Sequence, residues 1–185
     1  MEIRFLKWLQ TIRTPFLDSF FKIYTKLGDH GELWFLLILF FIFIKKDRKT
    51  GILAAFSLAI EIVLISLVLK PIFSRPRPFL KEAIDLLIKI PHGSSFPSGH
   101  SASSFAVAGF LFFEKVRFRW LYIFLATLMA FSRLYLFVHY PSDVLVGSFI
   151  GLFIAYGVFK KQDHIWQWLT KQKSRIFKKE ASTQE

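Results

Sequence analysis

Cysteine is absent from this sequence of 185 residues, and acidic residues are few beside basic ones. Without cysteine the chain forms no disulfide and offers neither a thiol nucleophile nor a zinc–thiolate site. It has 13 Asp and Glu residues against 25 Lys and Arg, which gives a net charge of +12. No recognition module for nucleic acid supports a nucleic-acid interpretation of this excess of basic residues, so we expect no nucleic acid among the partners. The N-terminus also lacks the apolar run and small-residue cleavage site of a signal peptide, so none is expected.

Hydrophobic residues make up 54% of the chain, and Phe alone occurs 24 times. They lie in long runs separated by short charged stretches, a pattern typical of an integral membrane protein. We therefore predict an all-α fold, a polytopic transmembrane helix bundle with about five spans. The runs centre on residues 31–44, 52–70, 100–114, 120–138 and 144–160.

An amphipathic stretch, FLDSFFKIYTKL, precedes these runs at residues 16–27. Its aromatic residues recur at helical spacing, and Asp18, Lys22 and Lys26 lie opposite them. The pattern predicts a helix lying in the membrane interface, and leaves open whether this helix crosses the membrane. The chain thus divides into an interfacial N-terminal segment (1–30), a membrane-embedded domain (31–160) and a basic cytoplasmic tail (161–185).

Basic clusters indicate which side of the membrane is cytoplasmic. KKDRK (45–49), KVRFR (115–119) and the basic tail fall on one side of a five-span bundle. The positive-inside rule places that side in the cytoplasm, against anionic bilayer headgroups. The loops 71–99 and 139–143 then face outward, and they hold most of the unusual polar residues.

The first polar stretch, KPIFSRPRPF, carries three cations at the end of the second predicted span. Lys70, Arg75 and Arg77 alternate with prolines that prevent the helix from continuing. Such cations either extend from a helix end to the interface, as long basic side chains do, or bind the oxygens of a phosphate. The stretch alone leaves both interpretations open.

The second stretch, SSFPSGH, ends at the start of the third predicted span. Ser98 is a natural N-cap, Gly99 follows it, and His100 falls in the first helical turn. A helix N-terminus with free backbone N–H groups favours an anion. A simple capped helix with an interfacial histidine accounts for the same residues.

The third stretch, SRLYLFVHYPSD, begins inside an apolar run. Arg133 costs several kcal/mol there unless it is paired or reaches a polar cavity. His139 and Asp143 are four residues apart, so the carboxylate is able to fix the tautomer of the imidazole. A local capping pair is the alternative for these two residues.

Taken together, the polar residues of all three stretches fall on the same predicted face of the bundle. In such a group of residues the cations are able to bind an anion, one histidine to attack it and the other to protonate the leaving group. This arrangement predicts phosphoryl transfer through a phosphohistidine. The alternative is a small anion channel or carrier around Arg133 and the intramembrane Glu61. At its depth, Glu61 is expected to be neutral or bonded to a polar group of a neighbouring helix.

The three stretches together resemble the signatures of the type 2 phosphatidic acid phosphatase superfamily, which shares its site with the vanadium haloperoxidases. The matches are Lys70 with Arg77-Pro78, Pro97-Ser98-Gly99-His100, and Ser132-Arg133 with His139 and Asp143. The resemblance implies that His139 is the nucleophile, Asp143 its orienting partner and His100 the acid for the leaving oxygen. It also implies a phosphate site with neither metal nor cofactor, formed by Lys70, Arg77, Arg133, Ser98 and Gly99.

The resemblance further implies a lipid substrate and a cellular location. The expected substrate is an envelope lipid: undecaprenyl diphosphate or lipid A 1-phosphate is favoured, and phosphatidylglycerophosphate is next. The expected location is the cytoplasmic (inner) membrane of a bacterium, with the site facing the periplasm. The oligomeric state and the roles of Glu61 and Arg75 stay open.

Overall fold

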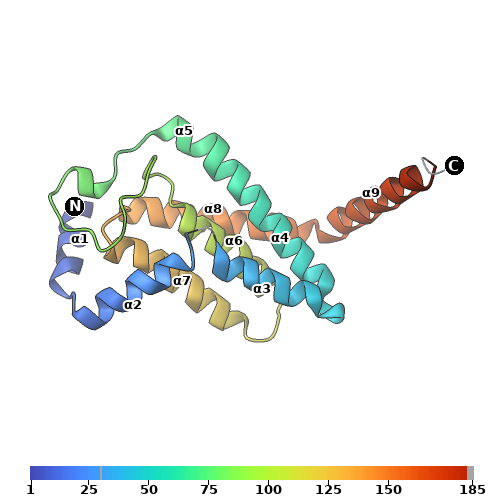
Figure 1. Cartoon of the computed structure of the whole chain (residues 1–185), viewed down its shortest axis with the longest axis horizontal. Helices are drawn as coiled ribbons and strands as arrows, with labels where there is room; N and C mark the ends of the chain where they lie inside the picture. Colours follow the sequence, from blue (N-terminus) through green and yellow to red (C-terminus); the bar gives the residue numbers. More distant parts are fainter. Residues whose placement is uncertain (30, 183–185) are drawn as a thin grey trace.

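The computed structural model describes residues 1–29 and 31–182, and the regular structure within them is helical throughout. The all-α fold predicted from the sequence is thereby confirmed. Figure 1 shows an elongated helix bundle from which one helix, α9, projects toward the C-terminus. The elements are α1 (Glu2–Thr11), α2 (Pro15–Lys26), α3 (Glu32–Phe43), η1 (Lys45–Asp47), α4 (Arg48–Ile62), η2 (Val63–Leu69), α5 (Lys70–Phe73), η3 (Pro78–Leu80), α6 (Gly99–Phe113), α7 (Arg119–Tyr135), α8 (Pro141–Lys160) and α9 (Gln162–Ser182).

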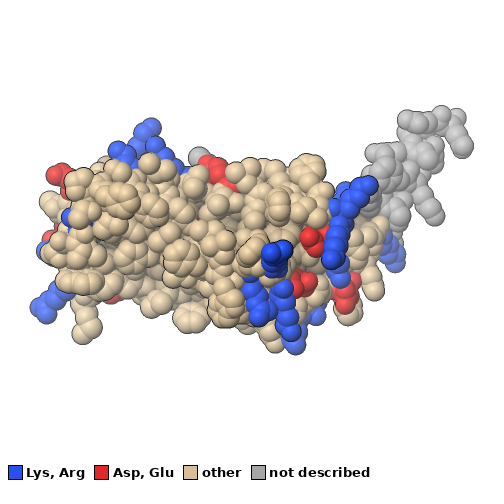
Figure 2. All heavy atoms as spheres, turned by 90° about the horizontal axis from the view of Figure 1, so that it is seen from below, with Lys and Arg blue, Asp and Glu red and all other residues tan. Residues whose placement is uncertain are grey.

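Five helical segments occupy the predicted membrane spans: α3, α4 with its π-helical continuation η2, α6, α7 and α8. By length and composition, the stretch Lys45–Leu80 and α8 are each able to cross a membrane, whereas α3 and α6 are apolar but shorter. Large apolar side chains on the outside are exposed, for example Leu67 (70%) and Phe153 (80%). Figure 2 shows a broad uncharged zone, with lysine and arginine gathered mostly toward the two ends of the long axis. This surface suits lipid around its middle.

Helix α6 lies at the centre of the bundle, in contact with α4, α7 and, most extensively, α8. Two glycines of α8 allow the close approach: a Cβ at Gly147 would lie 2.5 Å from the backbone oxygen of Ser98, and one at Gly151 would collide with that of Ala102. The small-residue pattern GSFIG at 147–151 therefore serves close helix packing. As a result, the N-termini of α6 and α8 lie side by side, joined by a 3.0 Å hydrogen bond from Ser98 N to Asp143 O.

The N-terminal segment forms two helices, of which the sequence predicts the second. In α2, Phe16 is 77% exposed, as expected of a helix in the interface. In α1, Leu6 and Leu9 are fully buried and belong to one apolar cluster with Phe137 and Tyr140. The segment therefore packs against the connection between α7 and α8 in addition to presenting apolar side chains to the outside.

The predicted basic tail begins where α8 ends. A new helix, α9, starts at Gln162 and runs to Ser182. Residues 183–185 of the predicted tail, and residue 30 of the predicted interfacial segment, lie outside the described residues.

Candidate active site

The three polar stretches of the sequence meet around one cavity of about 1000 Å³. Six of the eight predicted site residues line it: Lys70, Arg77, Gly99, His100, Arg133 and His139. The other two, Ser98 and Asp143, are fully buried directly behind its wall. Segments that are far apart in the sequence are thus brought to one place in the folded chain.

His139 lies in the connection between α7 and α8 and is only 2% exposed. Its Nε2 is 3.2 Å from Nη1 of Arg77, which is always a donor, so Nε2 is the acceptor and the imidazole proton sits on Nδ1. Nδ1 is 3.6 Å from Oδ2 of Asp143, close enough for electrostatic attraction but too long for a hydrogen bond. Burial lowers the pKa of His139 well below its usual value, and the charges of Arg133 and Arg77 act in the same direction. The imidazole is therefore neutral, with an unprotonated Nε2.

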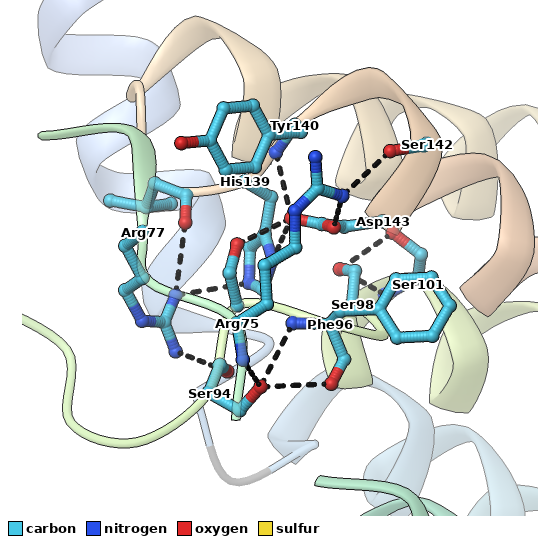
Figure 3. A network of polar contacts seen from close by, with 12 residues as sticks. Arg75, Arg77, Ser94, Phe96, Ser98, Ser101, His139, Tyr140, Ser142 and Asp143 are labelled. Atoms are coloured by element: carbon cyan, nitrogen blue, oxygen red, sulfur yellow. Dashed lines mark hydrogen bonds and ion pairs between the residues drawn. The ribbon is translucent and has the colours of Figure 1, made fainter. Parts of the chain in front are cut away.

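Asp143 is held by the start of its own helix and by the loop before α6. Its Oδ2 accepts a 2.9 Å hydrogen bond from the backbone N of Tyr140 and another from the hydroxyl of Ser95. Figure 3 shows the bond from Tyr140 N reaching the carboxylate beside His139. The carboxylate therefore keeps a fixed orientation toward the imidazole.

Three cations line the cavity. Within the described residues, none of Lys70, Arg77 and Arg133 forms an ion pair. Arg77 instead donates to the backbone oxygens of residues 92, 93 and 138, at 3.0–3.2 Å. Arg133, 2% exposed, donates through Nη1 to Thr25, and its Nε has no partner among the described residues. Buried cations that form no ion pair among the described residues favour an anionic ligand in the cavity.

The N-terminus of α6 faces the same cavity. Ser98 is its N-cap, as the sequence predicts, and its hydroxyl accepts from Ser101 N at 3.4 Å. The ammonium group of Lys70 lies close to Gly99, because a Cβ there would be 3.6 Å from Nζ. The backbone at Gly99 is thus open to a ligand that Lys70 also reaches.

His100 has a partner that the sequence did not identify. Its Nε2 lies 3.2 Å from Oδ1 of Asp29, in the turn between α2 and α3. Asp29 belongs to the sequence GDHG, which reads as a simple turn, and no signal in the sequence links it to His100. The second histidine is thus also oriented by a carboxylate, here at the edge of the cavity.

Arg75 contacts Asp143 and not the cavity. Its Nη1 donates to Oδ1 of Asp143, and also to the hydroxyl of Ser142 at 2.7 Å. Arg75 is absent from the lining of the 1000 Å³ cavity. The sequence left its role open because an arginine among prolines fits a phosphate ligand equally well.

Glu61 is 2% exposed and lies on α4, below the phosphate-binding candidates. It lines a smaller cavity of about 300 Å³ together with Lys70, Gly99 and His100. Its carboxyl group has no hydrogen-bonding partner among the described residues, so the expected bond to a neighbouring helix is not seen there, and the neutral form stays a prediction. The two cavities meet at Lys70 and His100, which line both.

The chain is similar to known proteins in sequence and in structure. A family model described as the PAP2 superfamily matches residues 50–167. The chain is 26% identical over 147 residues to the undecaprenyl-diphosphatase BcrC of Bacillus subtilis, covering 80% of this chain and 76% of that protein. It is 31% identical over 172 residues to the lipid A 4'-phosphatase of Bacteroides thetaiotaomicron, covering 83% and 73%. The crystal structure of Aquifex aeolicus LpxE is similar with a TM-score of 0.74 and 32% identity, over 86% of this chain and 94% of that one. The range 50–167 contains every predicted site residue but none of α1, α2 or α3.

Proposed function

Because the chain belongs to the PAP2 superfamily and is a membrane lipid phosphatase, we propose that it hydrolyses its substrate through a phosphohistidine on His139. The proposal rests on one observation. His139, whose Nε2 is unprotonated, lines the same cavity as three cations that form no ion pair among the described residues. A nucleophile and an anion site are thus held within reach of one phosphorus atom.

In the first step, Nε2 of His139 attacks phosphorus in line with the leaving oxygen. Lys70, Arg77 and Arg133 bind the phosphate oxygens, with Ser98 and the backbone N–H of Gly99 beside them. The N–P bond forms as the P–O bond to the lipid breaks, and protonated His100 donates its proton to the departing oxygen. Asp143 stabilises the positive charge that appears on the imidazole of His139.

In the second step, water attacks the phosphorus of the phosphohistidine. His100, now neutral, takes a proton from this water, and the P–N bond breaks to release inorganic phosphate and neutral His139. The proton balance closes, because His100 returns to the protonated form in which it began. Neither a metal ion nor an organic cofactor takes part in the proposed cycle.

The substrate that we propose carries a second phosphate besides the one removed, which favours undecaprenyl diphosphate or lipid A, with phosphatidylglycerophosphate next. The support comes from three further lysines, Lys22, Lys26 and Lys89, which line the same cavity and form no ion pair among the described residues. Lysine binds a phosphate as a mobile point charge. Together they provide more positive charge than a single phosphate requires.

The site is proposed to face the periplasm of a bacterial inner membrane. The loops 45–49 and 115–119 lie at the opposite ends of the spans and carry the basic clusters that the positive-inside rule assigns to the cytoplasm. Substrate tails then stay in the bilayer while the headgroup enters the cavity. Exposed apolar residues near the site, such as Ile62 (50%) and Leu67 (70%), suit this placement.

Phosphate release by purified protein tests the proposal. The panel contains undecaprenyl diphosphate, lipid A, phosphatidylglycerophosphate and, as a substrate with one phosphate, phosphatidic acid. The variant Lys22→Ala/Lys26→Ala/Lys89→Ala should raise KM for the preferred lipid by about tenfold, the equivalent of one charge-assisted contact, and change KM for phosphatidic acid less. Lys81→Ala, an exposed lysine outside the cavity, is the control. Failure of the wild-type protein to release phosphate from any of these lipids would refute the proposed function.

A further inference from the structure

The guanidinium group of Arg75 is fixed on several sides. One edge donates to Asp143 and Ser142, as Figure 3 shows, and Nη2 donates to Oε2 of Glu2 at 2.8 Å. Its central carbon lies 4.0 Å from the centre of the Tyr140 ring, in a cation–π contact. Both terminal nitrogens of Arg75 are thus engaged by protein groups, and the side chain lies outside the lining of the 1000 Å³ cavity that Lys70, Arg77 and Arg133 share.

Glu2 belongs to α1, outside the range that matches the family model. Its second oxygen, Oε1, accepts a 2.9 Å hydrogen bond from the backbone N of Ser142, in the first turn of α8. Burial acts to raise the pKa of Glu2, but the bonds from Ser142 and Arg75 outweigh it and lower that pKa below its usual value. One ionised carboxylate thus ties α1 both to Arg75 and to the helix that carries Asp143.

The packing of α1 keeps this carboxylate in place. Leu6 and Leu9 are buried in the cluster around Phe137, and the amide of Gln10 donates to the backbone oxygen of Tyr135 at 3.1 Å. These contacts attach α1 to the segment that leads into His139. The position of Glu2 is therefore set by the same connection that carries the nucleophile.

We propose that Glu2 and Arg75 act as positioning residues for the reaction at His139, a role that rests on the proposed function. Glu2 holds the Arg75 guanidinium on Oδ1 of Asp143, which leaves Oδ2 directed at Nδ1 of His139. Without Glu2, the arginine is free to rotate and engage both carboxylate oxygens, because its fork matches a carboxylate bidentately. Asp143 would then turn away from the imidazole and stabilise its developing charge less.

The test compares Glu2→Gln, Arg75→Gln and the double variant with Lys7→Gln. Lys7→Gln is a matched control, because Lys7 also ties α1 to the outer loop, through a 2.8 Å ion pair with Glu82, but does not touch the Asp143 network. For each protein, kcat, KM and the thermal midpoint are measured in the same detergent, with turnover expressed per folded molecule. Arg75→Lys is added because lysine keeps the charge but lacks the fork.

We expect kcat to fall about fivefold to tenfold in Glu2→Gln and about 100-fold in Arg75→Gln, with KM within twofold, since neither side chain lines the phosphate cavity. The double variant should match Arg75→Gln, because Glu2 acts through Arg75. Arg75→Lys should recover little of the loss, and Lys7→Gln should keep wild-type kcat.

Three results would overturn the inference: a Glu2→Gln variant no slower than Lys7→Gln, multiplicative losses in the double variant, or a loss expressed mainly in KM. The last would make Arg75 a substrate ligand. Each of these leaves the proposed function standing, because the wild-type protein still releases phosphate. Absence of phosphate release by the wild-type protein is a different outcome, and it removes both proposals.

Discussion

Substitution of Gly147 by alanine should push the start of α6 away from Asp143 and His139 without replacing any residue that is proposed to contact substrate. Gly147 lies on α8, one turn after Asp143, and faces the residue that caps α6. An added Cβ would lie 2.5 Å from the backbone oxygen of Ser98 and 3.3 Å from its carbonyl carbon and nitrogen. An ordinary contact of this kind is at least 3.4 Å, so the Ser98 backbone must retreat by about 0.9 Å. All three neighbours are backbone atoms, so the strain is not relieved by the movement of a flexible side chain.

The expected loss follows from that displacement. Ser98, Gly99 and His100 are consecutive, so moving the Ser98 backbone moves the start of α6 relative to Asp143 and His139. A misplacement of about 1 Å in a catalytic constellation costs on the order of 100-fold in rate. Overpacking also costs roughly 1–3 kcal/mol of stability, so the thermal midpoint should fall by several degrees.

Gly157→Ala provides the matched control on the same helix. A Cβ at Gly157 meets no atom within 4 Å, so its substitution should leave turnover unchanged and, through helix propensity, leave stability equal or slightly higher. Both variants are assayed for phosphate release per folded molecule, with folding checked by gel filtration and thermal unfolding. If folded Gly147→Ala turns over within threefold of Gly157→Ala, the close approach of α8 to Ser98 does not set the geometry of the site.

Three further expectations concern pH, inhibition and topology. Because burial lowers the pKa of His139, the histidine stays neutral as pH falls through 6.5. The acid limb of kcat/KM, corrected for ionisation of the substrate, should therefore lie below pH 6.5. A midpoint at or above pH 6.5 would contradict the role of His139 as the nucleophile. Vanadate should inhibit, because it adopts the five-coordinate shape of the transition state, whereas EDTA should leave turnover intact; loss in EDTA with recovery in magnesium would require another mechanism. A cysteine replacing the exposed Lys89 should react with an impermeant thiol reagent in intact spheroplasts, and labelling only after lysis would invert the proposed topology.

The sequence predicted the five spanning helices, α2 and the signature residues around the cavity because all of these leave local signals. Apolar runs mark α3, α4, α6, α7 and α8, and the serine before Gly99 and the proline after Tyr140 mark two helix starts. The three signatures then name residues whose spacing within each stretch is fixed. Placing the stretches at one cavity required only that the outward loops share a face of the bundle.

The partners that orient these residues carry no such signal, because each pair joins distant segments. Glu2 and Arg75 are 73 residues apart, and Asp29 and His100 are 71 apart. Thr25, which accepts from the buried Arg133, comes from a helix that the sequence describes only as interfacial. Such contacts depend on how α1 and α2 pack against the bundle, and single-sequence patterns do not determine that packing.

The most direct test of the central claim is to trap the phosphoenzyme. His100→Asn should slow the attack of water more than the attack of His139 on a substrate with a good leaving group, so that labelled phosphate accumulates on the protein. After reaction with a ³²P-labelled lipid, we expect an alkali-stable, acid-labile phosphate on the peptide containing His139, and none in His139→Ala/His100→Asn. Phosphate on a different residue, or turnover near the wild-type rate in a folded His139→Ala protein, would contradict it.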